Sequence, residues 1–255
     1  ISQLDFSDIC GQHTMKRGLE IAAAGMHHTM LIGPPGAGKS MAARRLPTIL
    51  PKMTWEECLE VSEIYSAAGL LKPAEGLITT RPFRSPHHTA SDVALAGGGR
   101  LPKPGEISLA HRGVLFLDEL TEFSSAAMEV MRQPIETGHI MINRLQAMCV
   151  FPAGFMLVAA INPCRCGYYP DVKKCHCTPL QIRRYIGRIS QPLMDRIDLN
   201  IEVLPARIES LQEAASDEER SAQILKRVEQ ARAMQDARYS GTVYRYNSQL
   251  HDRDV

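Results

Sequence analysis

The chain contains the phosphate-binding pattern G-x-x-x-x-G-K-[ST] at residues 33–40, and this pattern restricts the fold more than any other feature. An apolar run at residues 29–32 precedes it and predicts a buried strand, and a helical pattern follows from Lys39 to about Leu46. A strand that enters a glycine-rich loop and leaves it as a helix is the context in which the pattern holds phosphates. The alternative, a chance Gly/Pro turn, does not account for the flanking strand and helix.

Each part of this loop has a role in binding ATP. The glycines let backbone N–H groups turn inward around the phosphates, and the start of the following helix contributes its positive dipole end. We expect Lys39 to reach the β- and γ-phosphates and Ser40 to ligate Mg²⁺. The residues expected to contact ATP are Gly33, Pro34, Pro35, Gly36, Ala37, Gly38, Lys39, Ser40 and Met41.

Two further apolar runs end in polar side chains. Residues 114–117 are followed by Asp118 and Glu119, and residues 155–161 by Asn162. Ligands bind at the carboxyl ends of strands in open α/β sheets. We therefore expect Asp118 to hold Mg²⁺ and Glu119 to polarise the attacking water as general base, with Asn162 orienting water beside the γ-phosphate. The alternatives are two surface acids that end a strand and an asparagine that only caps one.

Strands that alternate with helices along the chain predict an α/β fold with a parallel sheet, here the three-layer sandwich of a P-loop NTPase. The apolar content of 44% suffices for a sizeable core. We expect residues 1–207 to form the nucleotide-binding core and residues 208–255 to begin a helical lid, whose helix starts at Ser216–Glu219. The core contains an irregular insert, a β-hairpin and a cysteine-rich loop, at residues 81–112, 139–151 and 163–178.

Charge and composition say little about partners. The net charge of +1 points to none in particular, so contact with nucleic acid would need local basic patches. No run approaches the roughly 18 uninterrupted apolar residues of a membrane span, and no signal peptide is visible, so we expect a cytoplasmic protein with no membrane partner. The start at Ile1 and the finish at Val255 suggest a fragment of a longer protein.

Four of the seven cysteines form a cluster with the spacing C-x-C-x₈-C-x-C: Cys164, Cys166, Cys175 and Cys177. Two tight pairs of thiolates suit a tetrahedral structural Zn²⁺ site, although a spacing of one residue within a pair is less usual than two. His176 is an alternative ligand. The other interpretations are four reduced thiols, or disulfides formed during purification.

Five segments together carry a resemblance to a known family: residues 8–12, 81–89, 104–111, 162–164 and 192–199, which read DICGQ, RPFRSPHHT, PGEISLAH, NPC and PLMDRIDL. They resemble the magnesium-chelatase-like branch of the AAA+ ATPases, and the resemblance runs from about residue 5 to residue 238. It implies a homo-hexameric ring with ATP at the subunit interfaces.

The resemblance also assigns a role to Arg196, whose position matches the arginine finger of the family. Such an arginine neutralises charge on the transferring phosphoryl group and is often supplied by a neighbouring subunit. The residues alone leave a second interpretation open, a surface arginine paired with Asp195 or Asp198.

In this branch, hairpins in the regions of residues 81–112 and 139–151 point into the pore of the ring. The resemblance therefore makes Arg144, Arg100 and Lys103 candidates for contact with DNA phosphates, which need only an exposed positive side chain. Solvated surface basic residues are an equal alternative. His87 and His88 lie in the insert as core, capping or metal-related groups, and the sequence does not separate these roles.

The resemblance favours a DNA-translocating motor with helicase or branch-migration activity in natural transformation and recombination, acting on single-stranded or branched DNA. A chelatase-like ATPase that drives remodelling or metal insertion through a partner protein is one alternative, and a nucleotide-dependent interaction module without motor output is another. Two departures are expected to matter: members of the branch carry a domain before this module that residues 1–255 do not include, and these residues end before the position where a second sensor arginine is expected. We therefore expect the chain to bind nucleotide but to hydrolyse it poorly alone.

Overall fold

The computed structural model describes residues 4–72, 76–99, 102–144, 147–205 and 218–250. The chain forms two compact units. The first unit consists of Ile1–Pro51, Ala160–Ile182 and Ile197–Val255, and the second consists of Lys52–Ala159 and Arg183–Arg196. Within the described ranges, no helix combines the length and the apolar character needed to span a membrane.

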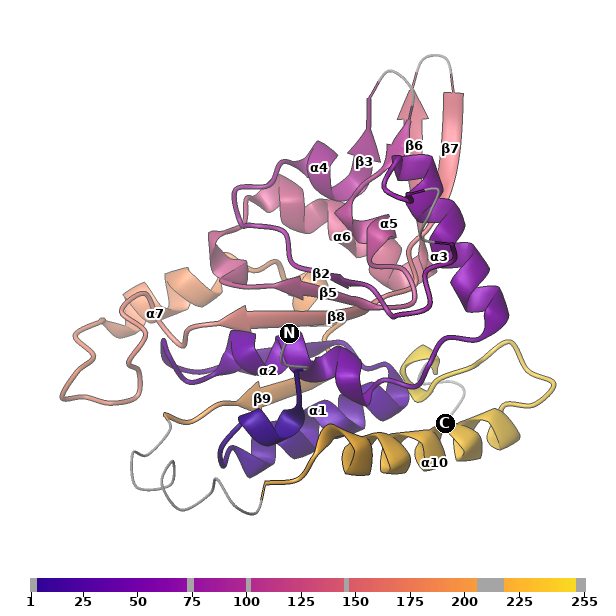
Figure 1. The fold of residues 1–255 in the computed structure, drawn as a ribbon. Coiled ribbons are helices and arrows are strands. Elements are labelled where there is room, and N and C mark those ends of the chain that lie inside the picture. Colours follow the sequence, from indigo (N-terminus) through magenta and orange to yellow (C-terminus); the bar gives the residue numbers. More distant parts are fainter. Residues whose placement is uncertain (1–3, 73–75, 100–101, 145–146, 206–217, 251–255) are drawn as a thin grey trace. The chain divides into compact units, whose positions relative to one another are not determined.

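The first unit is built on two parallel strands with helices beside them (Figure 1). β1 (Thr29–Ile32) pairs in parallel with β9 (Leu199–Glu202). α1 (His13–Gly25) packs against both strands and against α10 (Ser221–Arg238), because it has an apolar face that includes the fully buried Leu19. The described part of this unit also contains η1 (Phe6–Asp8), α2 (Lys39–Arg45), η2 (Leu46–Ile49) and η5 (Asn247–Gln249).

In its described residues, the second unit contains three parallel strands and two hairpins. β5 (Val114–Leu117) pairs in parallel with β2 (Phe83–Arg84) on one side and with β8 (Met156–Ile161) on the other. Every residue of β5 and β8 is buried, as expected for apolar runs in a parallel sheet that is covered on both faces. The hairpins are β3 (Gly97–Gly98) with β4 (Lys103–Pro104), and β6 (His139–Arg144) with β7 (Ala147–Pro152). The helices are α3 (Trp55–Ala68), α4 (Asp92–Ala96), α5 (Glu106–Leu109), η3 (Leu120–Glu122), α6 (Ser125–Thr137), α7 (Pro179–Ile186), which ends in this unit, and α8 (Gln191–Met194).

Strand β8 runs from the second unit into the first, with the boundary between Ala159 and Ala160. Its last residue, Ile161, accepts a hydrogen bond from the backbone N–H of Gly33 at 3.2 Å. The strand order is β2-β5-β8-β1-β9. A parallel sheet with a P-loop after β1 confirms the predicted α/β fold of a P-loop NTPase.

The capping residues in the sequence predict the start of α3 correctly. The hydroxyl of Thr54 accepts a hydrogen bond from the Glu57 N–H at 3.2 Å, and the Glu57 carboxylate accepts one from the Thr54 N–H at 3.2 Å. This capping box starts α3, and Gly69 ends it in the left-handed conformation. The insert, in contrast, is less irregular than the sequence indicates. It contains α4, the β3–β4 hairpin and α5, which are too short to show a hydrophobic period.

The expected start of the C-terminal helix at Ser216–Glu219 is wrong, because α10 begins at Ser221. Residues 216 and 217 lie outside the described ranges. Glu218 is not in a helix: its carboxylate accepts hydrogen bonds from the Gly11 N–H and from Lys16. The Ser221 hydroxyl accepts a hydrogen bond from the Phe6 N–H at 2.8 Å. Contacts with the N-terminal segment therefore replace the local cap that the sequence favours.

One buried histidine makes the second unit sensitive to acid. His111 is 5% exposed, and its Nδ1 accepts a hydrogen bond from the Gly154 N–H at 2.9 Å. The ring proton therefore sits on Nε2, which donates to a Glu60 carboxylate oxygen at 3.1 Å. Burial, and to a lesser extent the neighbouring Arg112, lowers the pKa of His111 to about 4, although Glu60 acts to raise it.

This tautomer predicts a loss of stability on acidification. Because the pKa of His111 is lower in the folded chain than in the unfolded chain, its contribution to stability is present above pH ~6.5 and is lost as the pH falls toward 4. Between pH 7 and pH 5 the loss should be about 1 to 2 kcal/mol of unfolding free energy. Urea unfolding of the wild type and of His111→Gln at both pH values measures it.

The variant should be less stable at pH 7 and should lose less stability on acidification than the wild type. His139→Gln, which replaces an exposed histidine, is the matched control and should keep the wild-type pH dependence. Equal acid sensitivity of His111→Gln and the wild type would contradict the assigned neutral tautomer.

Candidate nucleotide-binding site

The P-loop leaves β1 and becomes the first turn of α2, and its glycines are needed at specific points. Gly36 and Gly38 have φ angles of +74° and +91°, in the left-handed region that favours glycine. A Cβ on Gly33 would lie 2.2 Å from the Val203 carbonyl oxygen, so a larger residue would push β9 away. The loop backbone is therefore held close to the sheet at Gly33 and turns away from it at Gly36 and Gly38.

Lys39 carries the charged group of this loop. The residue is 7% exposed. Its Nζ donates hydrogen bonds to the carbonyl oxygens of Gly33 at 2.6 Å and Pro34 at 2.9 Å. It also lies 3.2 Å from the side-chain oxygen of Asn162, which accepts a third hydrogen bond. The structure thus brings together two residues that the sequence places 123 positions apart.

The other residues expected to contact ATP lie on the same loop and helix. Ser40 is half-buried in the first turn of α2, directly after Lys39, and Ala37 is buried. Met41 is exposed. Gln12, which precedes α1, donates from its amide to the Leu204 carbonyl at 2.6 Å and to the Ala37 carbonyl at 3.4 Å, and so ties the N-terminal segment to the loop.

In the second unit, the strand end after β5 carries the two predicted carboxylates. Asp118 accepts a hydrogen bond from the Glu119 N–H at 3.0 Å. Glu119 has a φ angle of +53°, and its side chain is 55% exposed. His88 places its Nδ1 3.6 Å from a Glu119 carboxylate oxygen. A protonated His88 would therefore form an ion pair with the predicted general base.

The sequence did not assign this contact to His88. The two histidines of the insert have different partners. His87 Nδ1 lies 2.9 Å from the Thr89 hydroxyl, a local turn contact, whereas His88 contacts Glu119. Their rings pack on each other with centroids 4.1 Å apart. The only sequence signal was two adjacent histidines in a Gly/Pro-rich segment, which does not indicate their partners.

Arg196 is half exposed and pairs with Glu136 of α6, with 2.6 Å between Nη2 and the carboxylate oxygen. The surface interpretation had named Asp195 or Asp198 as partner, and both were wrong. Asp195 accepts a hydrogen bond from the Gln191 amide at 2.7 Å. Asp198 accepts one from the His28 N–H at 2.8 Å, and hydrogen bonds from His27 and His28 lower its pKa although burial raises it.

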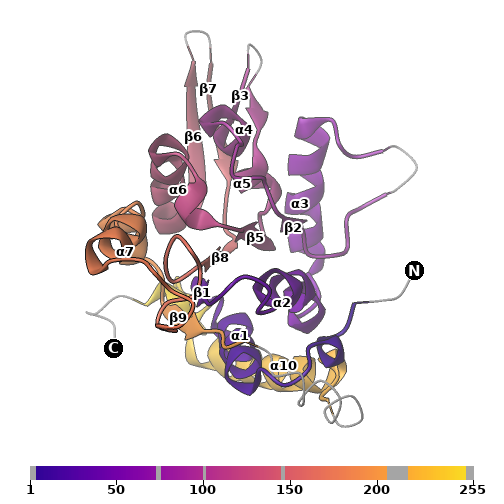
Figure 2. The ribbon, with the colours of Figure 1, turned by 90° about the vertical axis from the view of Figure 1, so that its left-hand side faces the viewer.

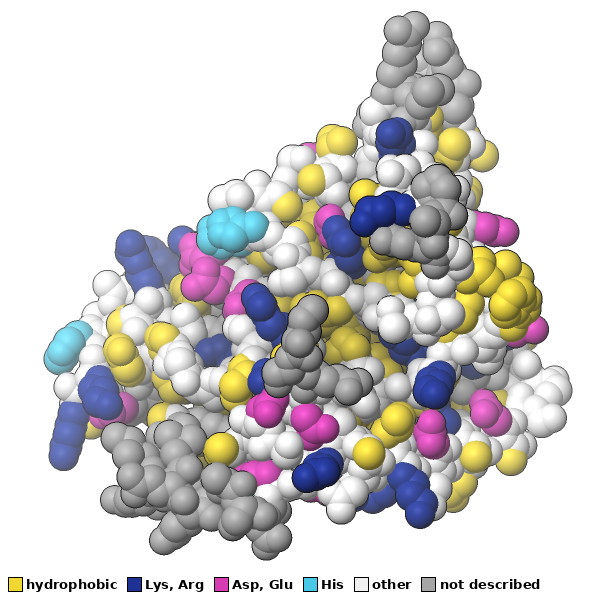
Figure 3. All heavy atoms as spheres, in the orientation of Figure 1, with side chains coloured by type: hydrophobic (Ala, Val, Ile, Leu, Met, Phe, Trp, Pro, Cys, Tyr) yellow, Lys and Arg dark blue, Asp and Glu magenta, His cyan; other side chains and the backbone are white. Residues whose placement is uncertain are grey.

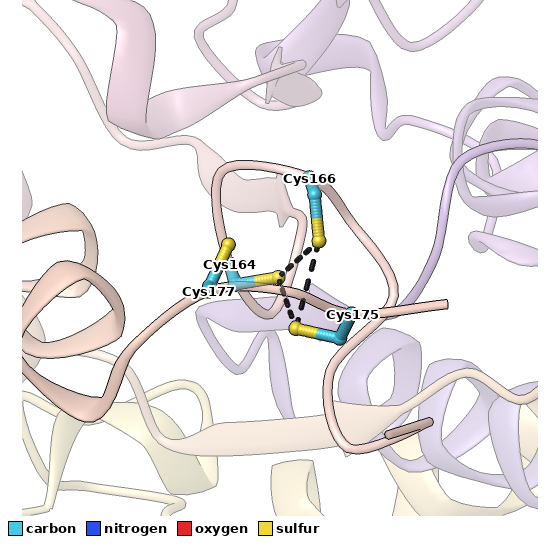
Figure 4. A group of neighbouring side chains, drawn as sticks. All are labelled: Cys164, Cys166, Cys175 and Cys177. Carbon is cyan, nitrogen blue, oxygen red and sulfur yellow. Dashed lines mark hydrogen bonds between the residues drawn. The ribbon is translucent and has the colours of Figure 1, made fainter. Parts of the chain in front are cut away.

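The four clustered cysteines converge in the first unit (Figure 4). Their sulfurs all lie within 4.8 Å of one another, a group that can hold a metal ion. Cys164 is fully buried, and the other three are partly buried. Burial raises the pKa of the Cys164 thiol, but hydrogen bonds from the Tyr169 and Gly167 backbone and from neighbouring thiols outweigh it and lower the pKa to about 6. His176 is exposed and does not belong to the group.

The two hairpins of the second unit lie side by side and extend in the same direction (Figures 1 and 2). A Cβ on Gly97 of β3 would lie 3.0 Å from the Ile142 side chain of β6, so the hairpins are in contact. β6 buries Ile140 and Ile142 on one face. On the opposite face, Met141, Met148 and Val150 are 45%, 70% and 50% exposed.

The candidate DNA contacts are only partly visible. Lys103 is exposed on β4, as a phosphate contact requires. Arg100 lies outside the described residues. Arg144 ends β6, and its side chain is likewise outside the described part. On the face drawn in Figure 3, basic and acidic side chains are intermixed, in keeping with the net charge of +1.

Comparison with known proteins identifies the family. The family model described as magnesium chelatase, subunit ChlI, matches residues 5–211. Competence protein ComM of Haemophilus influenzae is 47% identical over 254 residues, which are 98% of this chain and 49% of ComM. YifB of Salmonella typhimurium is 45% identical over 251 residues, which cover 98% and 48% of the two chains. The chain thus spans about half the length of these relatives.

More distant matches agree on the fold. The magnesium-chelatase 38 kDa subunit of Cereibacter sphaeroides is 25% identical over 220 residues, 79% of this chain and 59% of that subunit. In a structure of the complex between BchI and BchD of magnesium chelatase, one chain superposes with a TM-score of 0.58 at 23% identity, covering 92% of this chain and 77% of the other. The chain therefore belongs to the magnesium chelatase subunit ChlI family of AAA+ ATPases, with ComM and YifB among its relatives.

Proposed function

We propose that the chain binds Mg²⁺–ATP on the P-loop and hydrolyses it. The observation that carries this proposal is the arrangement of Lys39, whose ammonium group is held at the mouth of the loop by two loop carbonyls and by Asn162. Phosphate oxygens are stronger acceptors for an ammonium than neutral carbonyls, because the hydrogen bond is then charged on both sides. The lysine is therefore positioned to exchange a carbonyl for the β- and γ-phosphates.

The residues present suit a magnesium ion. Mg²⁺ prefers oxygen ligands and is held by few protein groups besides phosphates and water. Here the Ser40 hydroxyl and the Asp118 carboxylate would supply the protein ligands. When bound, the ion neutralises charge on the β- and γ-phosphates. Glu119 would accept the proton of the attacking water, His88 would hold Glu119 in place through their contact, and Asn162 would orient the water.

Arg196 is proposed to act on the ATP of a neighbouring subunit in a homo-hexamer. Its present partner, Glu136, is a half-exposed carboxylate, and surface ion pairs of this kind contribute only about 0 to 1 kcal/mol. The arginine can therefore leave Glu136 at little cost when a phosphate is offered. Because that phosphate would belong to a neighbouring subunit, Arg196 would leave Glu136 only in the assembled ring.

As the output of ATP hydrolysis, we propose translocation along single-stranded or branched DNA. Two observations support this choice: a relative with 47% identity is named a competence protein, and the β3–β4 and β6–β7 hairpins extend together from the second unit. A chelatase-like ATPase acting through a partner protein is the second candidate. It is favoured by the match to magnesium-chelatase 38 kDa subunits, but at only 25% and 26% identity.

Lys39→Ala and Glu119→Gln should separate binding from hydrolysis. Lys39→Ala should weaken ATP binding strongly and abolish turnover, because the group that meets the phosphates is removed. Glu119→Gln should retain binding and lose turnover by about 10² to 10⁴-fold, the usual contribution of a general base. Fluorescent-nucleotide titration of the chain and phosphate release by the complete protein measure the two effects.

Turnover that survives Lys39→Ala would refute the proposed site. ATP binding without turnover in the assembled wild type would support the third interpretation, an interaction module without motor output.

Arg196→Ala tests the proposed arginine finger. In the assembled protein it should retain ATP binding and lose turnover by about 10³-fold or more. Glu136→Ala is the matched control, because it breaks the same ion pair but leaves the arginine. If both variants lose the same small amount of turnover, Arg196 is only a structural partner of Glu136.

Lys103→Ala tests the hairpins as a DNA-contacting surface. Loss of one phosphate contact should weaken DNA binding about equally for all sequences and reduce the slope of log affinity against log salt by about 1. DNA-stimulated ATPase activity should fall with it. Lys226→Ala, an equal change of charge at an exposed position on α10, should leave both unchanged. An unaltered salt slope for Lys103→Ala would remove this residue from the interface.

If DNA does not stimulate the wild type but a partner protein does, the chelatase-like candidate is the better description of the output.

A further inference from the structure

The loop that carries the four cysteines leads away from the nucleotide site and returns to it. Ile161, at the end of β8, accepts the Gly33 N–H, and the next residue, Asn162, contacts Lys39. Five residues later, Gly167 meets the P-loop again: a Cβ added there would lie 2.6 Å from Pro35 Cδ and 3.9 Å from Asn162 Cγ. The cysteine loop is thus in contact with both the P-loop and Asn162, the residue proposed to orient the attacking water.

We propose that Cys164, Cys166, Cys175 and Cys177 bind one Zn²⁺ ion, and that this ion braces the nucleotide site by fixing Asn162 and the contact between Gly167 and Pro35. The bracing part rests on the proposed function, since it assumes that the P-loop binds ATP. It makes zinc and nucleotide binding cooperative.

The sulfur geometry suits zinc. Tetrahedral zinc–thiolate sites have Zn–S bonds of about 2.3 Å, so their sulfurs lie about 3.8 Å apart. Here the Cys164 sulfur lies 3.3 Å from the Cys166 sulfur and 3.7 Å from the Cys175 sulfur, and the Cys166 and Cys175 sulfurs are 3.6 Å apart (Figure 4). Each thiol that ligates the ion releases its proton to solvent. Four thiolate ligands leave no open position, which indicates a structural rather than a catalytic ion.

The loop is held by turns rather than by a helix or a strand, so an ion between its two cysteine pairs would add a cross-link that its backbone lacks. No helix or strand occurs between β8 and α7 in the described structure. The first cysteine pair is shaped by a turn in which the Gly167 N–H donates to the Cys164 carbonyl at 3.0 Å. The second follows a turn in which the Asp171 carbonyl accepts from the Cys175 N–H at 2.7 Å. One ion would join the two turns and close the intervening chain.

The position of the first pair explains how the ion would act on nucleotide. Cys164 is two residues from Asn162, and Cys166 is directly before Gly167. An ion that holds these two sulfurs fixes the short segment between Asn162 and Gly167, the residue that packs on Pro35. Without the ion, Asn162 and the P-loop must be ordered at the expense of nucleotide binding energy. A pre-ordered site binds more tightly because that cost is already met.

The cooperativity can be measured on the wild-type chain from both sides. Competition with a chromophoric chelator gives the zinc affinity with and without Mg²⁺–ADP, and fluorescent-nucleotide titration gives the nucleotide affinity of zinc-loaded and zinc-stripped protein, all under reducing conditions. We expect one zinc per chain and a change of about tenfold or more in both affinities. The two factors must be equal, because coupling between two binding sites is reciprocal. Cobalt substitution, read by its visible absorption, reports tetrahedral thiolate ligation.

Variants would test whether the change in nucleotide affinity comes from the four clustered cysteines. The double variant Cys166→Ser with Cys175→Ser should bind no zinc and should show the weakened nucleotide affinity of stripped wild type. Cys149→Ser, a cysteine of the second unit outside the cluster, should behave as wild type. Melting by circular dichroism shows whether each variant is folded, and if the double variant is not, the wild-type titrations decide alone.

The possible outcomes of these titrations test different parts of the inference. Absence of bound zinc would overturn the whole inference. Zinc binding with equal nucleotide affinity before and after stripping would overturn the bracing while leaving the metal site. A zinc-loaded chain that binds no nucleotide would instead refute the proposed function, and the bracing with it, while the metal content still stands as measured.

Discussion

The buried ammonium group of Lys39 is the constraint on which the first unit depends. At 7% exposure, a positive charge must have hydrogen-bond acceptors, because desolvating it alone costs several kcal/mol. The acceptors come from the loop after β1 and from Asn162 after β8, so the lysine draws two strand ends to one point. Gly33 must lack a side chain to allow this, since the Val203 carbonyl occupies the space. The glycine pattern therefore serves sheet packing as well as the proposed phosphate binding.

The sequence predicts an element of the fold well where residues close to it in the sequence determine where it begins and ends. β5 and β8 are apolar throughout and fully buried, and Thr54 caps α3 with its own Glu57, so both were predictable from short windows. The start of α10 was not, because Glu218 is used by Gly11 and Lys16, which lie about two hundred residues away. The short elements of the insert escaped for a related reason: four or five residues cannot show a helical period.

The candidate site divides in the same way. Lys39 and Asn162 were expected to share a site from their positions at strand ends, and the structure places them in hydrogen-bond contact. The contact between His88 and Glu119 was not predictable, since nothing in the sequence tells which of two adjacent histidines faces a carboxylate. The partner of Arg196 was not predictable either, because Glu136 lies 60 residues away on another helix, and a sequence pattern indicates only near neighbours. Side-chain pairing across elements is the information that local patterns lack.

The hairpins limit what kind of DNA contact this chain could make. The outer face of the β6–β7 hairpin exposes Met141, Met148 and Val150, and the exposed Lys103 lies on the neighbouring hairpin. Phosphate contacts give an affinity that falls steeply with salt, whereas contacts of apolar side chains with bases and sugars do not. Apolar contacts from this face would therefore add affinity without adding salt dependence, and the salt dependence would come from the basic residues of the hairpins. Tight binding would then require many subunits acting together, which is what a ring with a hairpin pair from each subunit would provide.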